Sequence, residues 1–433
     1  MNTPTLGRAR FHSKLSHTIS DAVRIPEHIE VGAKPGLQFE LAGPRDRLFF
    51  QGKTTRAGIV TCGGLCPGLN NVIRSLFLEL HYNYGVAEVI GFRGGYGGID
   101  PACGREPIKI TPAFVDGIHQ KGGTILGSSR GPVDIGRAVD NLIARKVDIL
   151  FTVGGDGTQR GANDIYQEAR RRGHAISVVG VPKTIDNDVG FVSRTFGFFS
   201  AVEEAVRVLD CAHTEARSVP GGIGLVKLMG RHAGFVTAGA TVASQDVNFA
   251  LIPEVPFELE AFLTALKKRM LRKSHAVIAV AEGAGQNLVG ADSAQRDASG
   301  NIKLKDIGPF LCERIKSYFA GERLPVVLRY FDPSYQIRSR PANSEDALLC
   351  DLFARHAAHA AMAGKTGLVI GFLHERFIHV PIELLATHTK RLDPASGWWR
   401  SVLAATGQPA QFGRARSKTT RRLSRRAVGP KGA

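Results

Sequence analysis

Short apolar runs that alternate with helical segments constrain the fold of this 433-residue chain more than any other feature. Apolar runs of four to eight residues, separated by helices of about 10–15 residues, are typical of βαβ units and parallel sheets. At about 150 residues per domain, the length allows two or three domains. We therefore predict an α/β protein with mostly parallel sheets. The runs expected to form strands are RAGIVTC (56–62), DILFTVGG (148–155), AISVVGVP (175–182), GIGLVKLMG (222–230), HAVIAVAEG (275–283), PVVLRYF (325–331) and TGLVIGFL (366–373).

The composition excludes several classes of protein. No apolar run reaches the roughly 18 residues that a membrane span needs, and the amino terminus has no apolar core of a secretory signal. That terminus contains arginine and little acid, which also permits an organelle transit peptide, but we expect an ordinary N-terminal arm. The six cysteines form no C-x-x-C pair. We expect reduced thiols, no membrane span and a cytoplasmic location.

The positive charge is concentrated at the carboxyl terminus. The chain has a formal net charge of +17, and the segment from Arg414 to the end contains eight basic residues and no acidic ones. Such a run is usually a solvated, disordered extension, which attracts anionic surfaces without specificity. We therefore expect no specific nucleic-acid partner. The remaining positive charge is compatible with anionic substrates.

Glycine-rich loops follow two of the predicted strands, where ligands of open α/β sheets bind. The loop Gly63–Gly68 can turn backbone N–H groups toward an anion, although a plain tight turn explains it equally well. Asp156 lies among Gly154, Gly155 and Gly157 in the second loop. A carboxylate in that setting can reach a Mg²⁺ ion that bridges nucleotide phosphates. The alternative is a simple helix cap.

Two further loops contain charged residues that suit phosphate chemistry. The sequence PKTIDND (182–188) places a lysine before two carboxylates, of which one can accept a hydroxyl proton. An ordinary Asp- and Asn-containing turn is the alternative. Arg231 follows the strand at 222–230 and could hold a phosphate or stabilise developing charge, although a lone arginine there is more often a surface residue.

Taken together, these loops make the sequence resemble the phosphofructokinase family. The resemblance runs from about Arg56 to Arg338 and continues more weakly to about Leu385. GGDGT alone occurs in other kinases, but PKTIDND about 25 residues later, followed by MGR, is highly specific. The motifs that match in order and spacing are GGLCPG (63–68), GSSRGP (127–132), GGDGT (154–158), PKTIDND (182–188), MGRHAG (229–234), PEVPF (253–257) and AEG (281–283).

The resemblance implies transfer of a phosphoryl group from ATP to the 1-hydroxyl of fructose 6-phosphate, with Mg²⁺ as cofactor. It implies that Asp186 is the base that takes the hydroxyl proton and that Asp156 holds the metal. Thr184 and Asp188 would order the hydroxyl and a metal-bound water, and Lys183 and Arg231 would supply positive charge. Such a transfer needs positioning, metal and positive charge more than covalent chemistry.

The resemblance also assigns two sets of binding residues. The residues implied for ATP are Gly63, Arg130, Gly131, Gly155, Asp156, Gly157 and Thr158. The residues implied for the sugar phosphate are Thr184, Ile185, Asp186, Met229, Gly230, Arg231, Glu282, Tyr335, Gln336, Ile337 and Arg338.

Two residues bear on the choice of phosphoryl donor. Lys183 resembles the pyrophosphate-using branch of the family and its ATP-using relatives, whereas that branch usually has Asp where this chain has Gly157. An Asp at that position would repel the α-phosphate of a nucleotide, so we favour ATP and keep a pyrophosphate-dependent enzyme as the alternative. A non-catalytic subunit is less compatible with the presence of Asp156, Asp186 and Arg231. An NAD kinase has no place for PKTIDND and MGR.

By the same resemblance, two Rossmann-like domains enclose the active site, and the protein is a homo-oligomer, a dimer or a tetramer. The expected parts are an N-terminal arm (1–55), an ATP-binding domain (56–197, completed by 339–390), a sugar-phosphate-binding domain (198–338) and a disordered basic tail (391–433).

Overall fold

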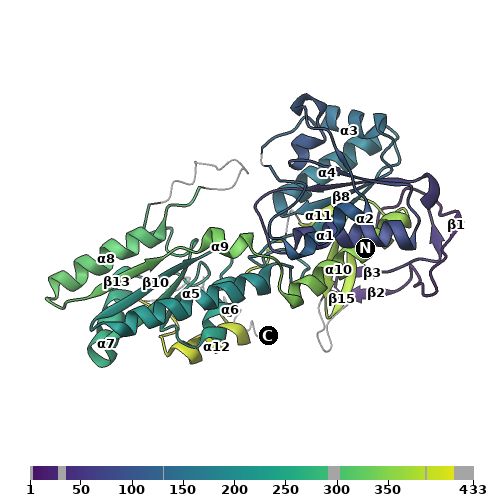
Figure 1. Ribbon diagram of the computed structural model, residues 1–433. Helices are drawn as coiled ribbons and strands as arrows, with labels where there is room; N and C mark the ends of the chain where they lie inside the picture. The colour runs from purple at the N-terminus through teal and green to yellow at the C-terminus, as the bar shows by residue number, and fades with distance from the viewer. Residues whose placement is uncertain (1–2, 28–35, 130, 291–302, 386–387, 414–433) are drawn as a thin grey trace, which may run out of the picture.

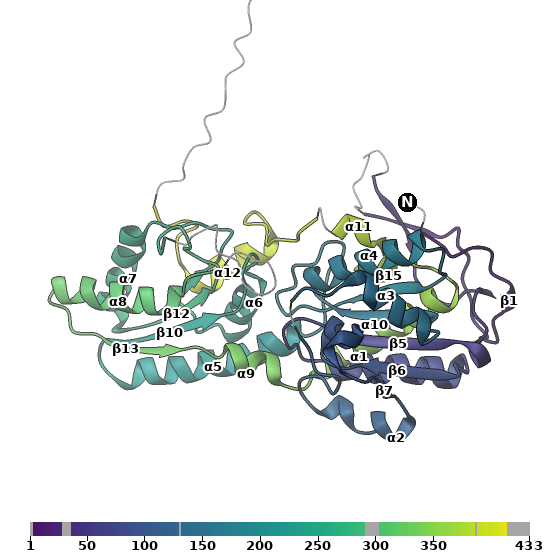
Figure 2. The same cartoon turned by 90° about the horizontal axis from the view of Figure 1, so that it is seen from above.

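The computed structural model describes residues 3–27, 36–129, 131–290, 303–385 and 388–413. These residues form two α/β lobes, each built around its own sheet (Figures 1 and 2). The prediction of an α/β fold with parallel strands is confirmed, and every strand that the apolar runs predict is present. No helix among the described residues is both long enough and apolar enough to cross a membrane.

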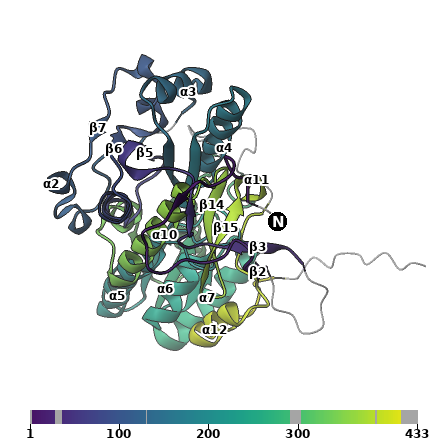
Figure 3. The same cartoon turned by 90° about the vertical axis from the view of Figure 1, so that its right-hand side faces the viewer.

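The first lobe contains a nine-stranded sheet in the order β2-β3-β15-β14-β9-β8-β5-β6-β7. Its central strands β14, β9, β8, β5 and β6 are parallel, and antiparallel strands flank them on both sides. Helices α1 and α10 pack together on one face, and α4 covers the other (Figure 3). The strands are β2 (Arg24–Pro26), β3 (Gln38–Leu41), β5 (Arg56–Thr61), β6 (Glu88–Phe92), β7 (Ile108–Lys109), β8 (Ile149–Gly154), β9 (Ser177–Pro182), β14 (Leu368–Leu373) and β15 (Arg376–Pro381); the main helices are α1 (Leu69–Leu78), α3 (Ile135–Ala144), α4 (Asp156–Arg171) and α10 (Ser344–Met362).

The second lobe contains a four-stranded parallel sheet in the order β11-β12-β10-β13. Helix α5 packs on this sheet together with α6, and α7 and α8 contact β12, β10 and β13. The strands are β10 (Gly222–Leu228), β11 (Phe249–Leu251), β12 (His275–Ala281) and β13 (Val327–Phe331); the helices are α5 (Phe198–Ser218), α6 (Phe235–Ser244), α7 (Leu259–Lys273), α8 (Ile307–Gly321), α9 (Ser334–Ser339) and α12 (Gly397–Thr406).

The chain crosses between the lobes more than once. It enters the second lobe with α5, returns to the first with α10, β14 and β15, and ends on the second lobe with α12. The domain bounds expected from the sequence stay a prediction, apart from the start of the disordered tail at residue 391.

The prediction of a disordered tail from residue 391 is wrong for residues 391–413. Ser396 caps helix α12 by accepting a hydrogen bond from the Trp399 N–H, and the helix packs on α6. Trp399 and Val402 lie on its buried face, and burying these side chains stabilises the segment. The boundary was misplaced because the basic run starts only at Arg414. Residues 414–433 lie outside the described residues.

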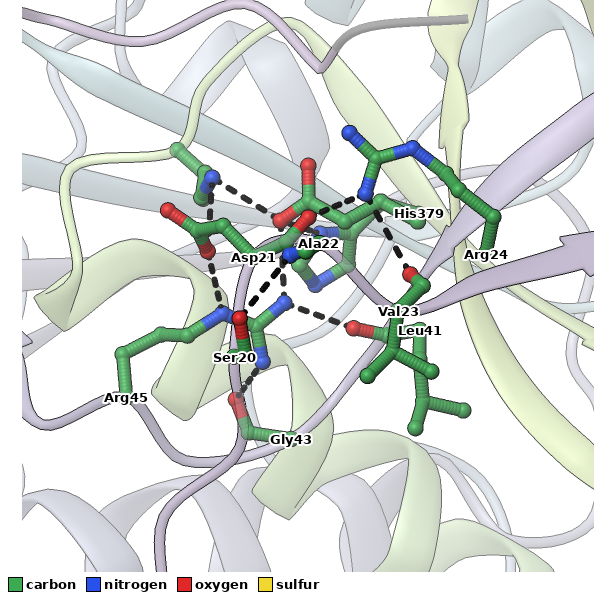
Figure 4. A network of polar contacts seen from close by, with 11 residues as sticks. Ser20, Asp21, Ala22, Val23, Arg24, Leu41, Gly43, Arg45 and His379 are labelled. Carbon is green, nitrogen blue, oxygen red and sulfur yellow. Dashed lines mark hydrogen bonds and ion pairs between the residues drawn. The ribbon is translucent and has the colours of Figure 1, made fainter.

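The N-terminal arm is part of the first lobe. Strands β2 and β3 extend its sheet beyond β15, and β1 (Phe11–His12) pairs with β4 (Arg47–Leu48). A buried cluster of charged side chains stabilises the β2–β3 edge of the sheet (Figure 4). Glu40 accepts from Arg45 at 2.9 Å and lies 2.8 Å from the Lys365 ammonium. All three side chains are almost completely inaccessible to water.

Glu40 and Asp21 share these two cations, since Asp21 lies 2.6 Å from Arg45 and 3.1 Å from Lys365. Burial by itself raises the pKa of the Glu40 carboxyl, but His379 and Lys365 beside it hold that pKa well below its usual range. Burial lowers the pKa of His379, and Glu40 opposes that shift. Because the pKa of Glu40 is lower in the folded chain, the stability that it contributes is present above the ordinary carboxyl pKa and is lost as the pH falls further.

We predict that Glu40→Gln lowers the free energy of unfolding at pH 7 by up to about 3–5 kcal/mol, because it leaves two buried cations with the exposed Asp21 as their remaining carboxylate partner. Chemical unfolding monitored by circular dichroism measures this loss. Glu106→Gln is the control, since Glu106 pairs with Arg145 at 2.9 Å on an exposed surface and should matter by less than about 1 kcal/mol. Equal stability of the Glu40 variant and the wild type at pH 7 would contradict the role of the cluster.

Candidate active site

A cavity of about 650 Å³ receives side chains from both lobes. Loops that follow β5, β8 and β9 line it from the first lobe, and loops that follow β10 and β12 line it from the second. Its lining residues are Cys62, Gly63, Gly64, Leu65, Tyr96, Ser129, Gly131, Pro132, Gly155, Asp156, Gly157, Thr158, Lys183, Thr184, Ile185, Asp186, Asp188, Val189, Met229, Arg231, His232, Glu282 and Arg338.

The register of the parallel strands brings the first-lobe loops together. Thr61 of β5 is paired with Val153 of β8, and Gly154 of β8 is paired with Pro182 of β9. The three strands therefore end at the same edge of the sheet, where the polar loop that follows each strand begins. Parallel pairing makes this convergence unavoidable, because parallel strands present their carboxyl ends on one side.

Lys183 connects two of these loops. Its ammonium donates to the Gly64 carbonyl at 2.7 Å, and it lies 3.5 Å from the place that a Cβ on Gly63 would occupy. Gly63 has a φ of +85°, which favours glycine. The glycine loop at Gly63–Gly68 can therefore form the turn and let the Lys183 ammonium approach closely, as an anion site requires.

Asp156 is the first residue of α4, and its carboxylate does not cap that helix. The N-cap is Gly155, which provides no side-chain hydrogen bond. Burial, with the negative charge of Asp188 nearby, raises the pKa of Asp156 to about 6. The simple helix-cap reading of this residue is therefore not supported. The Asp156 side chain is open to solvent, and the positive charge of Arg160 opposes the rise in its pKa only in part. A carboxylate placed this way, beside the negative charge of Asp188, is suited to a cation.

The loop that carries Asp186 is held by its own side chains. Thr184 accepts from the Asp186 N–H at 3.0 Å, and its hydroxyl donates to Asp188 at 2.9 Å. Asn187, at φ +54°, accepts from the Thr195 N–H at 3.0 Å. These hydrogen bonds of Thr184 and Asn187 hold the turn in shape. The Asp186 Oδ1 atom is buried and makes no hydrogen bond within the described part of the chain. Its carboxylate remains available to a ligand.

Asp186 is surrounded by charges of both signs. Burial raises the pKa of its carboxyl well above the usual range, and the negative charges of Asp188 and Glu282 add to this shift. The positive charges of Lys183 and Arg231 oppose it. A carboxylate whose pKa is raised in this way is a stronger base than an ordinary one.

Two loops of the second lobe complete the cavity by packing directly on each other. A Cβ at Gly283 would lie 1.9 Å from the Arg231 carbonyl oxygen, and the Gly283 N–H donates to the Gly230 carbonyl at 3.1 Å. This contact fixes Arg231 relative to Glu282. Burial raises the pKa of Glu282, which the positive charge of Arg231 opposes. Burial and Arg231 together lower the pKa of His232.

The cavity collects most of the residues that the sequence singles out. Those that line it are Gly63, Gly131, Gly155, Asp156, Gly157, Thr158, Lys183, Thr184, Ile185, Asp186, Asp188, Met229, Arg231, Glu282 and Arg338. Gly230 lies between Met229 and Arg231 with a φ of +128°. Arg130 lies outside the described residues.

The segment SYQIR fits the prediction only in part. Arg338 lines the cavity, but Ile337 is completely buried in the hydrophobic core, so its side chain is not available to a ligand. Tyr335 is 75% exposed, with the Arg338 guanidinium 4.6 Å from its ring centroid. Tyr335 and Gln336 are not among the residues that line the cavity. The segment is the helix α9, which points successive side chains in different directions.

Eight lining residues were not among the predicted site residues: Cys62, Gly64, Leu65, Tyr96, Ser129, Pro132, Val189 and His232. Tyr96 donates to the Thr158 carbonyl at 2.6 Å and follows β6, a strand that the sequence analysis did not identify. Cys62 ends a predicted strand, and His232 lies inside the motif MGRHAG, yet neither was given a role. The glycine-rich run GGYGG after β6 was the signal that could have revealed Tyr96.

Comparison with known proteins points to one family. A profile described as Phosphofructokinase matches residues 56–361. An ATP-dependent 6-phosphofructokinase of Trypanosoma brucei brucei is 49% identical over 370 residues, covering 85% of this chain and 76% of the relative. The enzyme of the same name from Borreliella burgdorferi is 45% identical over 379 residues, covering 86% and 85%. ATP-dependent 6-phosphofructokinase 4, chloroplastic, of Arabidopsis thaliana is 42% identical, covering 88% and 73%.

The fold is shared with solved structures of lower identity. The pyrophosphate-dependent phosphofructokinase from Marinobacter aquaeolei has a TM-score of 0.68 at 20% identity, and the match covers 88% of this chain and 98% of that one. This likeness concerns the fold alone.

We predict that Asp186→Asn stabilises the folded chain. Because the pKa of Asp186 is raised in the folded state, ionising this group costs stability above the ordinary carboxyl pKa. Asn keeps the shape without the charge, so the midpoint of thermal unfolding should rise by a few degrees at pH 8 and by less at pH 5. Differential scanning calorimetry at both pH values measures this. A variant that unfolds at a lower temperature than the wild type at pH 8 would contradict the assignment of buried negative charge.

Proposed function

The chain belongs to the phosphofructokinase family, and we propose that it phosphorylates D-fructose 6-phosphate at the 1-hydroxyl with ATP, giving fructose 1,6-bisphosphate and ADP. This makes it an ATP-dependent 6-phosphofructokinase, a kinase of glycolysis. The observation that carries the proposal is the meeting of Asp156, Lys183, Asp186 and Arg231 in one cavity. These residues come from both lobes and provide the metal ligand, the base and the positive charge that phosphoryl transfer needs.

The glycine loops form the donor side of the cavity. The backbone of Gly155, Asp156 and Gly157 at the N-terminus of α4 offers N–H groups and a positive dipole to the ATP phosphates. Gly63 and Thr158 line the same side, although their own N–H groups donate to the carbonyls of Ser129 and Gly155. Asp156 fits a Mg²⁺ ion, because its carboxylate lines the cavity, is open to solvent and does not cap α4, and Mg²⁺ usually binds one or two carboxylates together with substrate phosphates. When bound, the metal supplies charge neutralisation to the phosphates.

Asp186 is the base on the acceptor side. Its carboxylate, which lines the cavity, can accept the proton of the sugar 1-hydroxyl as the hydroxyl oxygen attacks phosphorus. Thr184 and Asp188 hold the loop in position, and Lys183 and Arg231 stabilise the negative charge on the transferring group. Arg231, Glu282 and Arg338, with the backbone of Met229 and Gly230, are proposed to hold the sugar phosphate.

Gly157 supports ATP as the donor. The nearest atom to a Cβ at this position is a nitrogen of Arg160 at 4.0 Å, so the space beside the backbone is open to a nucleotide. The relatives above are ATP enzymes at 42–49% identity. Lys183 is the observation that favours the second candidate, a pyrophosphate-dependent enzyme, because that branch of the family also has a lysine there.

The quaternary structure and the location are further proposals. A homo-oligomer is consistent with the exposed apolar side chains Tyr335 and Leu348, which are 75% and 61% accessible in the single chain. A cytoplasmic location is consistent with the six cysteines, which are all free.

We predict that Asp186→Asn lowers kcat by about 100- to 10,000-fold with little change in either KM, because a general base acts on the transition state. Steady-state kinetics of fructose 1,6-bisphosphate formation measure this. Asp140→Asn, which alters an exposed carboxylate on α3, is the control and should keep its activity. Turnover near that of the wild type in the Asp186 variant would refute the assignment of the base.

We predict that Gly157→Asp raises the KM for ATP by about 10-fold or more and leaves the KM for fructose 6-phosphate nearly unchanged, because the new carboxylate repels the nucleotide phosphates. Gly157→Ala fills the same open space without charge and should resemble the wild type. If the Asp and Ala variants have the same KM for ATP, the electrostatic account of donor choice is wrong.

A further inference from the structure

A short segment near the carboxyl terminus joins the two halves of the cavity. We call residues 388–392 the strap; it follows the first lobe's β15 and α11 (Ile382–Leu385) and leads into α12 on the second lobe. None of its residues lines the cavity among the described residues, and the resemblance assigns it no role. Its contacts nevertheless reach the loop that carries Asp186 and the loop that carries Arg231.

One end of the strap holds the loop of the base. The Lys390 N–H donates to the Asp188 carbonyl at 3.0 Å, and Thr389 forms a β-bridge with Val189. The Lys390 ammonium then donates to the carbonyls of Val192 and Ser193, both at 2.8 Å. The strap therefore binds the backbone between residues 188 and 193, shortly after Asp186 in the chain.

The other end holds the loop of the arginine. The Lys390 ammonium lies 5.0 Å from the ring centroid of Phe235, the first residue of α6, a cation–π distance. The Leu392 N–H donates to Glu254 at 2.8 Å. The same carboxylate accepts from the Gly234 N–H at 3.0 and 3.1 Å, directly after the loop of Arg231.

Lys390 is well placed to act through these loops. Its side chain is largely enclosed, and burial lowers the pKa of its ammonium to about 7, which the negative charge of Asp188 opposes. The Lys390 side chain has little conformational freedom, because it is enclosed and bonded to two carbonyls. Its contacts therefore link the position of the Asp186 loop to that of the Arg231 loop. Both the charged and the neutral form can donate to these carbonyls.

We propose that Lys390 is a positioning residue for phosphoryl transfer, which holds the Asp186 loop of the first lobe in register with the Arg231 loop of the second. This inference rests on the proposed function. Asp186 and Arg231 come from different sheets, so their relative placement depends on contacts between the lobes. A misplacement of about 1 Å can reduce turnover about 100-fold.

The simpler explanation is that Lys390 only anchors α12. The chain contains a spectroscopic probe that distinguishes this structural role from the proposed positioning role. Both of its tryptophans, Trp398 and Trp399, lie in α12. Trp398 packs against Phe198 and Phe235, with ring centroids 6.1 Å apart in each case, and Trp399 is buried. Tryptophan emission therefore reports whether α12 stays docked beside the strap.

The test is Lys390→Met, which keeps an unbranched side chain over Phe235 and removes the ammonium that donates to the carbonyls of Val192 and Ser193. The backbone N–H of residue 390 is unchanged. We expect kcat per ATP-binding site, counted by equilibrium binding, to fall about 10- to 100-fold. Both KM values should stay within about 3-fold, and tryptophan emission should be unchanged. Lys267→Met, which makes the same change at a surface ion pair with Glu322, should keep wild-type kinetics.

A wild-type kcat in the Lys390 variant would overturn the inference, and so would a red-shifted tryptophan emission with loss of ATP-binding sites, because α12 would then have undocked. A wild type that does not phosphorylate fructose 6-phosphate with ATP would refute the proposed function itself.

The second end of the strap offers an independent check. Glu254→Ala should also lower kcat. Because both residues act on one strap, the double variant should be no slower than the slower single variant. If the two effects multiply instead, Lys390 and Glu254 act separately and the coupling is wrong.

Discussion

Parallel pairing of β5, β8 and β9 is the constraint on which the rest of the site depends. It ends three strands at one edge of the sheet and so brings together three loops that are far apart in the sequence. Each loop alone has an ordinary explanation, as a turn or a helix cap. Together they form a surface of glycine backbone, three carboxylates and a lysine, which no single turn requires.

The second constraint is electrostatic. Asp186 is buried near two other carboxylates, and the positive charges of Lys183 and Arg231 oppose but do not abolish the resulting rise in its pKa. Such an arrangement reduces stability and is retained where a base is needed. The ionic cluster around Glu40 shows the opposite balance, since the neighbours of that carboxyl lower its pKa. Buried charge therefore stabilises the arm and activates the site.

The sequence predicted the interior strands well because they are continuous apolar runs. It missed β3 and β15, where Glu40 and His379 interrupt the apolar pattern. Glu40 pairs with the nearby Arg45 but also contacts Lys365 and His379, which lie far along the chain. It missed β6, which is short and contains Gly91. Local pattern carries no information about such distant partners.

The site was predicted to a similar extent and for a similar reason. Motif residues at strand ends reached the cavity, whereas Ile337 did not, because a motif does not tell which helix side chains point inward. The strap could not be predicted at all, since its contacts are to backbone carbonyls and one carboxylate of other segments. Helix α12 was not predicted, because the disordered tail was expected to begin at residue 391.

We infer that the two lobes gather a nucleoside triphosphate and a sugar phosphate around Asp186. The most direct measurement is product formation by the wild type with fructose 6-phosphate when ATP and pyrophosphate are offered in parallel, each with Mg²⁺. We expect that fructose 1,6-bisphosphate accumulates with ATP and ADP appears in equal amount, while pyrophosphate supports little or no reaction. Product formation with pyrophosphate alone, or with neither donor, would contradict this inference.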